Sequence, residues 1–174
     1  MASKALNAIR KLYPPAVAAE LARRELARRH LADFVLFTYV GQYQMGWVHQ
    51  ELCSALEQFL QDVINKRSPR LLVTMPPRHG KSELVSRRFP AWVFGNHPDM
   101  SFISSSYTSD LACRLSSDVQ RIMQDDPYKL LFKDTVIGGK GYKCTTELFE
   151  ICGRKGVYRA AGVGGGITGM GHLS

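Results

Sequence analysis

The sequence predicts an α/β fold in which a mostly parallel sheet is flanked by helices. Short strand patterns alternate with longer segments of helical periodicity, which is typical of that class. A turn containing Gly-Lys-Ser joins one strand pattern to one helix pattern within residues 75–82. Of the 174 residues, 45% are apolar and 22% are charged. This composition suits one domain with a hydrophobic core.

A helical N-terminal extension is predicted for residues 1–45. Two prolines at positions 14 and 15 open a helix, because proline is tolerated in a first turn. The Ala-, Leu- and Arg-rich sequence that follows favours helix to about residue 31. The apolar residues 34–39 are expected to pack near the core, and glycines at positions 41 and 46 interrupt the pattern.

The middle of the chain predicts a long helix, a strand and a second helix. Apolar residues recur at helical spacing through residues 47–64, and residues 65–69 form a turn. The Leu-Leu-Val run in residues 70–75 predicts a short buried strand. Helical spacing returns in residues 83–94, and the Gly-Asn-His-Pro-Asp sequence after them is a stop signal.

The second half of the chain predicts one further strand, one helix and a hairpin. Residues 101–105 form the strand, and residues 111–123 form a helix with Ser109 or Asp110 as its N-cap. Two strand patterns at 148–152 and 157–160 are separated by Gly-Arg-Lys-Gly, which predicts a hairpin with a glycine-assisted turn.

The stretch before the second helix predicts a phosphate-binding loop. Such a loop turns backbone N–H groups toward a polyphosphate, while Lys81 reaches the β- and γ-phosphates and the Ser82 hydroxyl holds Mg²⁺. The positive end of the following helix favours the same anion. The full pattern asks for glycine five positions before Gly80, where Met75 stands. The alternative is an ordinary strand–turn–helix connection with a surface lysine.

The charge of the chain is compatible with a polyanionic partner. The net charge is +8 and the pI is near 9.5. Two arginine pairs, at positions 23–24 and 28–29, lie on the first predicted helix. They indicate either a solvated helix face or a contact with DNA or another subunit.

No targeting or membrane segment is expected. The longest apolar runs are only a few residues, and the N-terminal residues contain no apolar signal core. A cytoplasmic location is therefore predicted. The four cysteines lack zinc-type spacing. Cys53 and Cys113 fall in helix patterns and are expected to be buried thiols, and Cys144 and Cys152 flank a predicted strand.

Several separate motifs together resemble the ATPase domain of the large terminase subunits of tailed phages and prophages. They are Trp47-Val48-His49, Pro76-Pro77-Arg78-His79-Gly80-Lys81-Ser82, Phe89-Pro90-Ala91-Trp92, Ser105-Ser106-Tyr107-Thr108 and Gly164-Gly165-Gly166-Ile167-Thr168-Gly169. The resemblance covers residues 34–174 and implies a partial P-loop ATPase domain at 46–174. It also implies binding of ATP and Mg²⁺, with double-stranded DNA, a small terminase subunit, the capsid portal and further copies of the chain as partners. The activity implied is ATP hydrolysis coupled to DNA translocation into a procapsid, and the location implied is the cytoplasm of the host cell.

The resemblance assigns roles to individual residues. It implies that Lys81 and Arg78 are catalytic residues and that Ser82 is a ligand of Mg²⁺. The residues that would bind the nucleotide are Pro76, Pro77, Arg78, His79, Gly80, Lys81 and Ser82. A salt-bridged loop arginine is the alternative for Arg78. Tyr107 matches a motif that contacts DNA or couples to the nucleotide. Trp47 and His49 are placed on the adenine side, and a core tryptophan is the alternative for Trp47.

The sequence departs from the family pattern at its end. In the family the Gly-rich stretch, here 162–171, runs into a strand ending in acidic residues, and the alternative here is a flexible tail. Asp125-Asp126, Glu147 and Glu150 lack the apolar run that such a strand needs. The expectation is ATP binding without efficient hydrolysis, an open sheet edge, no nuclease domain, and a truncated or split gene. A non-catalytic prophage remnant, a nucleotide- or partner-binding module, and a helicase-like ATPase are the alternatives.

Overall fold

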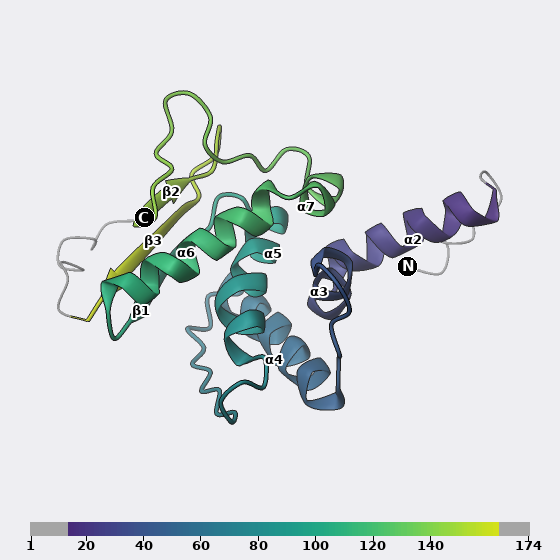
Figure 1. Cartoon of the computed structure of the whole chain (residues 1–174), viewed down its shortest axis with the longest axis horizontal. Helices are drawn as coiled ribbons and strands as arrows, with labels where there is room; N and C mark the ends of the chain where they lie inside the picture. The colour runs from purple at the N-terminus through teal and green to yellow at the C-terminus, as the bar shows by residue number, and fades with distance from the viewer. Residues whose placement is uncertain (1–13, 164–174) are drawn as a thin grey trace. The chain divides into compact units, whose positions relative to one another are not determined.

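The computed structural model describes residues 14–163, which form an α/β protein of two compact units. One unit lies within residues 1–80 and the other within residues 81–174. The described residues contain six α-helices, one π-helical turn and three strands (Figure 1). The Gly-rich residues 164–171 lie outside the described range.

The first unit is helical. It contains α2 (Pro15–Arg29), α3 (Leu31–Thr38) and α4 (Trp47–Ile64), and the bounds of α4 are those predicted. His30 separates α2 from α3, and the Glu57 carboxylate of α4 accepts a hydrogen bond of 2.6 Å from the Leu31 N–H. The arginine pairs of α2 mostly meet acids of the same helix, with Arg24 on Glu20 and both Arg28 and Arg29 on Glu25. The ion pairs of those three arginines therefore favour the alternative of a solvated helix face.

The second unit packs helices on a small mixed sheet. Its elements are the π turn η1 (Glu83–Arg88), α5 (Phe89–Asn96), β1 (Ser101–Ser106), α6 (Ser109–Gln124), α7 (Asp126–Leu131), β2 (Leu148–Glu150) and β3 (Val157–Gly162). The strand order is β1-β3-β2. β1 pairs with β3 in parallel, with Ile103 opposite Arg159, and β2 pairs with β3 antiparallel. The hairpin is confirmed. The sheet is mixed, with one parallel and one antiparallel strand pair, so the predicted α/β class is confirmed and the mostly parallel sheet is found only in part.

The core of the second unit is aromatic. Phe94 of α5 meets Phe102 of β1 with ring centroids 5.2 Å apart, and Phe149 stacks on Tyr158 at 5.0 Å. α6 lies along β1 and β3 (Figure 1). Thr108 caps α6 by accepting a hydrogen bond from the Leu111 N–H at 3.2 Å. The cap is therefore Thr108 rather than Ser109 or Asp110, because only the residue before the first helical one can reach the third helical N–H.

The strand predicted for residues 70–75 is absent from the described sheet. Leu72 is 90% exposed, and Leu71 is exposed as well. A β-strand exists through backbone hydrogen bonds to a partner strand, and no described strand pairs with this segment. The Leu-Leu-Val run is therefore not a buried strand here.

Candidate functional site

Two residues of the loop before residue 81, on either side of His79, have left-handed backbone. Arg78 has φ +64° and Gly80 has φ +80°. The left-handed region is costly for residues with a Cβ and natural for glycine. A Cβ on Gly80 would lie 2.7 Å from the Tyr43 hydroxyl oxygen and 3.3 Å from His49 Nε2. Glycine is thus required at position 80 both by its backbone angle and by the side chains behind it.

Histidines hold this loop within the first unit. His49, in the first turn of α4, accepts a hydrogen bond at Nδ1 from the Gly46 N–H at 3.0 Å. Its Nε2 lies 3.1 Å from the His79 carbonyl oxygen. The His79 Nδ1 in turn lies 2.8 Å from the Pro77 carbonyl oxygen. The Tyr43 ring meets the His49 ring edge-on at 5.6 Å, so α4 and the loop form one packed cluster.

The outer side of the loop is open to solvent. Arg78 and His79 are exposed, as are Pro76 and Pro77. The backbone N–H of Gly80 forms no hydrogen bond among the described residues. Arg78 forms no ion pair within residues 14–163. The salt-bridged alternative for Arg78 is therefore not favoured, and the loop offers unused donors.

Helical backbone begins directly after Gly80, at the start of the second unit. Lys81 and Ser82 are both exposed and helical, and Ser82 has φ −67° and ψ −31°. A π-helical turn follows, in which the Phe89 N–H donates to the Leu84 carbonyl five residues earlier. Pro90 comes next, and proline has no N–H and crowds the carbonyl four residues before it. The wide turn is the kind of irregularity that proline produces in a helix.

Acidic side chains near the helix start are tied to arginines. Glu83 accepts from Arg88 Nε at 2.7 Å and from Arg87 Nη1 at 3.2 Å. Arg87 also donates to Asp118 of α6 at 2.7 Å. Arg88 is only 7% exposed, so its charge needs this partner. Glu83 therefore stabilises the π turn through Arg87 and Arg88, and Arg87 joins that turn to α6 through Asp118.

The described contacts do not bring the other predicted site residues close to one another. Trp47 is 79% exposed, so it is not a core tryptophan. Tyr107 is 87% exposed at the carboxyl end of β1. Asp125 and Asp126 stand at the start of α7, which the sequence did not predict. Asp125 therefore precedes a helix and Asp126 begins it, so neither ends a strand.

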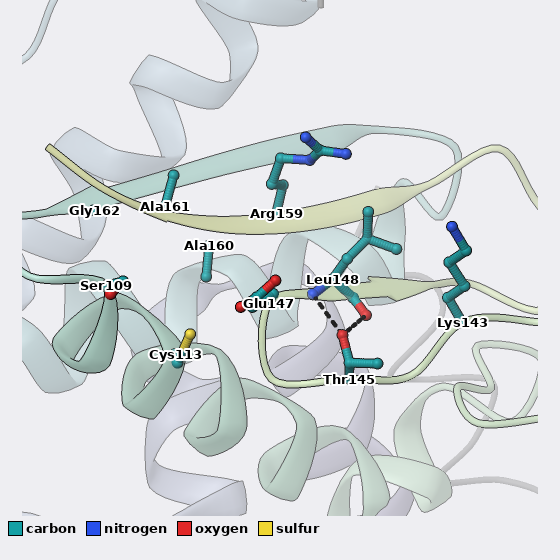
Figure 2. A pocket seen from close by; sticks show the side chains of 10 residues that line it. All are labelled: Ser109, Cys113, Lys143, Thr145, Glu147, Leu148, Arg159, Ala160, Ala161 and Gly162. Carbon is teal, nitrogen blue, oxygen red and sulfur yellow. Dashed lines mark hydrogen bonds between the residues drawn. The ribbon is translucent and has the colours of Figure 1, made fainter. Parts of the chain in front are cut away.

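A cavity of about 590 Å³ opens beside α6 and β3 in the second unit (Figure 2). Its lining comes from α6, the segment before β2, and the strands themselves: Ser109, Cys113, Lys143, Thr145, Glu147, Leu148, Arg159, Ala160, Ala161 and Gly162. β3 approaches α6 closely here, because a Cβ on Gly162 would lie 2.6 Å from the Ser109 backbone nitrogen. No sequence motif could have revealed this cavity, since its residues come from segments far apart in the chain.

Cysteine and metal chemistry gain no support from the described residues. All four cysteines are free thiols. Burial raises the pKa of Cys53 to about 12, with a smaller contribution from the nearby Glu57 carboxylate. Cys113 is partly exposed, so only Cys53 is the fully buried thiol expected. Residues 14–163 contain no group of three or more His, Cys, Asp or Glu side chains suited to a metal ion.

Two further findings bear on what the protein does. None of the helices within the described residues combines the length and apolar character needed to cross a membrane. The chain matches no protein-family model, no curated protein and no solved structure. Its function is therefore inferred from its own residues.

Proposed function

We propose that the chain binds Mg·ATP through residues 76–82 as the N-terminal ATPase portion of a viral DNA-packaging motor, a terminase large subunit. The proposal rests on one observation. The Pro-Pro-Arg-His-Gly-Lys-Ser sequence has a left-handed glycine at position 80, immediately before two helical residues, Lys81 and Ser82. A glycine turn that leads into a helix start is the arrangement by which backbone N–H groups face a phosphate.

Each residue of the loop has a role in this proposal. The free N–H of Gly80 donates to a phosphate oxygen. Lys81 supplies a mobile positive charge, and Arg78 adds a second cation from the exposed side of the loop. The Ser82 hydroxyl is exposed and forms no hydrogen bond within the described residues, so it fits a ligand of Mg²⁺. Bound Mg²⁺ would neutralise part of the charge on the phosphates.

Double-stranded DNA is the proposed macromolecular partner. The net charge of +8 favours a polyanion, and Tyr107 offers an exposed side chain at the end of β1. In the motor, ATP hydrolysis drives DNA into the procapsid, and the small terminase subunit, the portal and further copies of the chain complete the assembly. The resemblance of the motifs supports these partners.

Nucleotide binding is tested by titrating the chain with Mg·ATP in a calorimeter. Lys81→Ala removes a charge-assisted contact with the phosphates, and we expect affinity to fall about tenfold to 150-fold. Lys140→Ala is the matched control, because Lys140 is an exposed lysine with no ion pair among the described residues. Equal affinity in the wild type and the Lys81 variant would overturn the proposal.

The motor is distinguished from a non-catalytic binding module by turnover. Phosphate release is measured with and without double-stranded DNA. Turnover that DNA stimulates and that Lys81→Ala abolishes supports the motor. Saturable ATP binding with no turnover under either condition agrees with the expected lack of efficient hydrolysis and supports the binding module. Turnover that Lys81→Ala leaves unchanged refutes the catalytic role of Lys81.

A further inference from the structure

The contacts of His49 determine which of its ring nitrogens carries the hydrogen. A backbone N–H can only donate, so Nδ1, which lies 3.0 Å from the Gly46 nitrogen, must accept. The hydrogen is therefore on Nε2. A carbonyl oxygen can only accept, so Nε2 donates to the His79 carbonyl at 3.1 Å. The neutral Nε2–H form of His49 satisfies both contacts at once.

The bond to the His79 carbonyl orients a whole peptide group. A trans peptide is planar, and its C=O and N–H point in opposite directions. Because His49 holds the His79 C=O toward α4, the N–H of Gly80 in the same peptide points away from α4. That N–H has no hydrogen-bond partner among the described residues. His49 thus fixes the direction of one of the donors that the proposed phosphate site needs.

A second histidine contact restrains an earlier peptide of the loop. His79 Nδ1 lies 2.8 Å from the Pro77 carbonyl oxygen, so this nitrogen carries a hydrogen and donates. The contact fixes the peptide between Pro77 and Arg78, and Arg78 has the left-handed φ of +64°. His49 thus donates from Nε2 and His79 donates from Nδ1, and together they restrain two peptides of the loop.

We propose that His49 is a positioning residue, which sets the loop in its phosphate-binding conformation through the His79 carbonyl; this inference rests on the proposed nucleotide site. His49 does not contact the base in this role. Both of its ring nitrogens are engaged by backbone groups, so neither is left to form a hydrogen bond with an adenine. Stacking of the ring on the base is the alternative that the comparison of ATP with tripolyphosphate tests. Tyr43 supports the same arrangement, because its ring packs on His49 and its hydroxyl lies behind Gly80.

Two substitutions separate the two contacts of His49. His49→Asn keeps an acceptor near the place of Nδ1 for the Gly46 N–H but is too short to reach the loop. His49→Gln places an amide nitrogen about as far out as Nε2 and keeps a donor for the His79 carbonyl. The asparagine variant therefore loses the loop contact, while the glutamine variant retains it.

The decisive measurement compares Mg·ATP with Mg·tripolyphosphate, which has no base. His49→Asn is expected to weaken both ligands by the same factor, about threefold to tenfold, since one neutral hydrogen bond orders the loop. His49→Gln is expected to weaken them less. A loss confined to ATP would mean that His49 contacts the base and would overturn the inference, as would unchanged affinity for both ligands.

Two readouts do not depend on nucleotide binding. Nitrogen-15 NMR of the imidazole rings should report the Nε2–H tautomer for His49, and backbone nitrogen-15 relaxation at Gly80 should show larger motion in His49→Asn than in His49→Gln. If the wild type binds no nucleotide but both results hold, the proposed function fails and the positioning of the loop stands. An Nδ1–H tautomer, or equal motion of the Gly80 amide in both variants, refutes the positioning itself.

Discussion

Replacing Gly80 by alanine should destabilise the first unit through two separable effects. The first is the backbone angle: at φ +80° a residue with a Cβ costs about 1–2 kcal/mol. The second is the space: the new Cβ would lie 2.7 Å from the Tyr43 hydroxyl oxygen, so a packed side chain must move. Such overpacking costs about 1–3 kcal/mol. The expected total is therefore about 2–5 kcal/mol.

Gly41 isolates the backbone effect. It has φ +94°, and nothing lies within 4 Å of the position of its Cβ. Gly41→Ala should therefore cost only the angular term, and the difference between the two variants measures the contact with Tyr43. The assay is urea unfolding followed by circular dichroism. Tyr43→Phe removes the obstructing oxygen and should recover part of the loss in the Gly80→Ala background. Equal destabilisation by both alanine variants would refute the packing of Tyr43 against the loop.

Three further predictions concern stability and reactivity. Thr108→Ala removes the cap of α6 and should lower the free energy of unfolding by about 1 kcal/mol in urea titration, whereas serine at that position should restore most of it. The Cys53 pKa is raised from its ordinary 9.0 to about 12, so this thiol should resist iodoacetamide at pH 8 in the folded protein, as mass spectrometry of labelled peptides would report. Because the folded pKa is the higher one, its contribution to stability is full below pH 9 and falls as the pH rises toward 12. Glu83→Gln leaves the Arg88 charge without its carboxylate and should cost about 1–3 kcal/mol in the same urea assay, while Glu51→Gln, on an exposed residue, should cost almost nothing; equal costs would contradict the role of Glu83.

Elements with local signals were predictable from the sequence. The helix at Trp47–Ile64 agrees with its prediction to the residue, because its apolar spacing is continuous and Gly46 precedes it. The β2–β3 hairpin was predictable from the glycines of its turn, of which Gly153 has φ +70°. Both signals lie within a few residues of the structure they specify, so no distant partner is needed to interpret them.

Features that depend on distant residues were not predictable. Residues 70–75 have strand composition, yet a strand requires a partner that composition cannot name. The loop contact of His49 joins residues thirty positions apart, so the sequence marked His49 only as an adenine-side candidate. The π turn was missed because helical spacing is judged against a regular helix.

The π turn at Glu83–Arg88 has a consequence for insertions and deletions. A π turn holds one residue more than an α turn over the same rise. Loss of one residue there would convert it to regular helix and leave the side chains at both ends facing as before. In α6, which is regular throughout, the same loss would rotate every later side chain by about 100° around the axis, because one α-helical turn takes 3.6 residues. The segment after Ser82 is therefore a place in the second unit where one residue other than the buried Leu84 and Arg88 can be deleted while the helix on both sides keeps its facing.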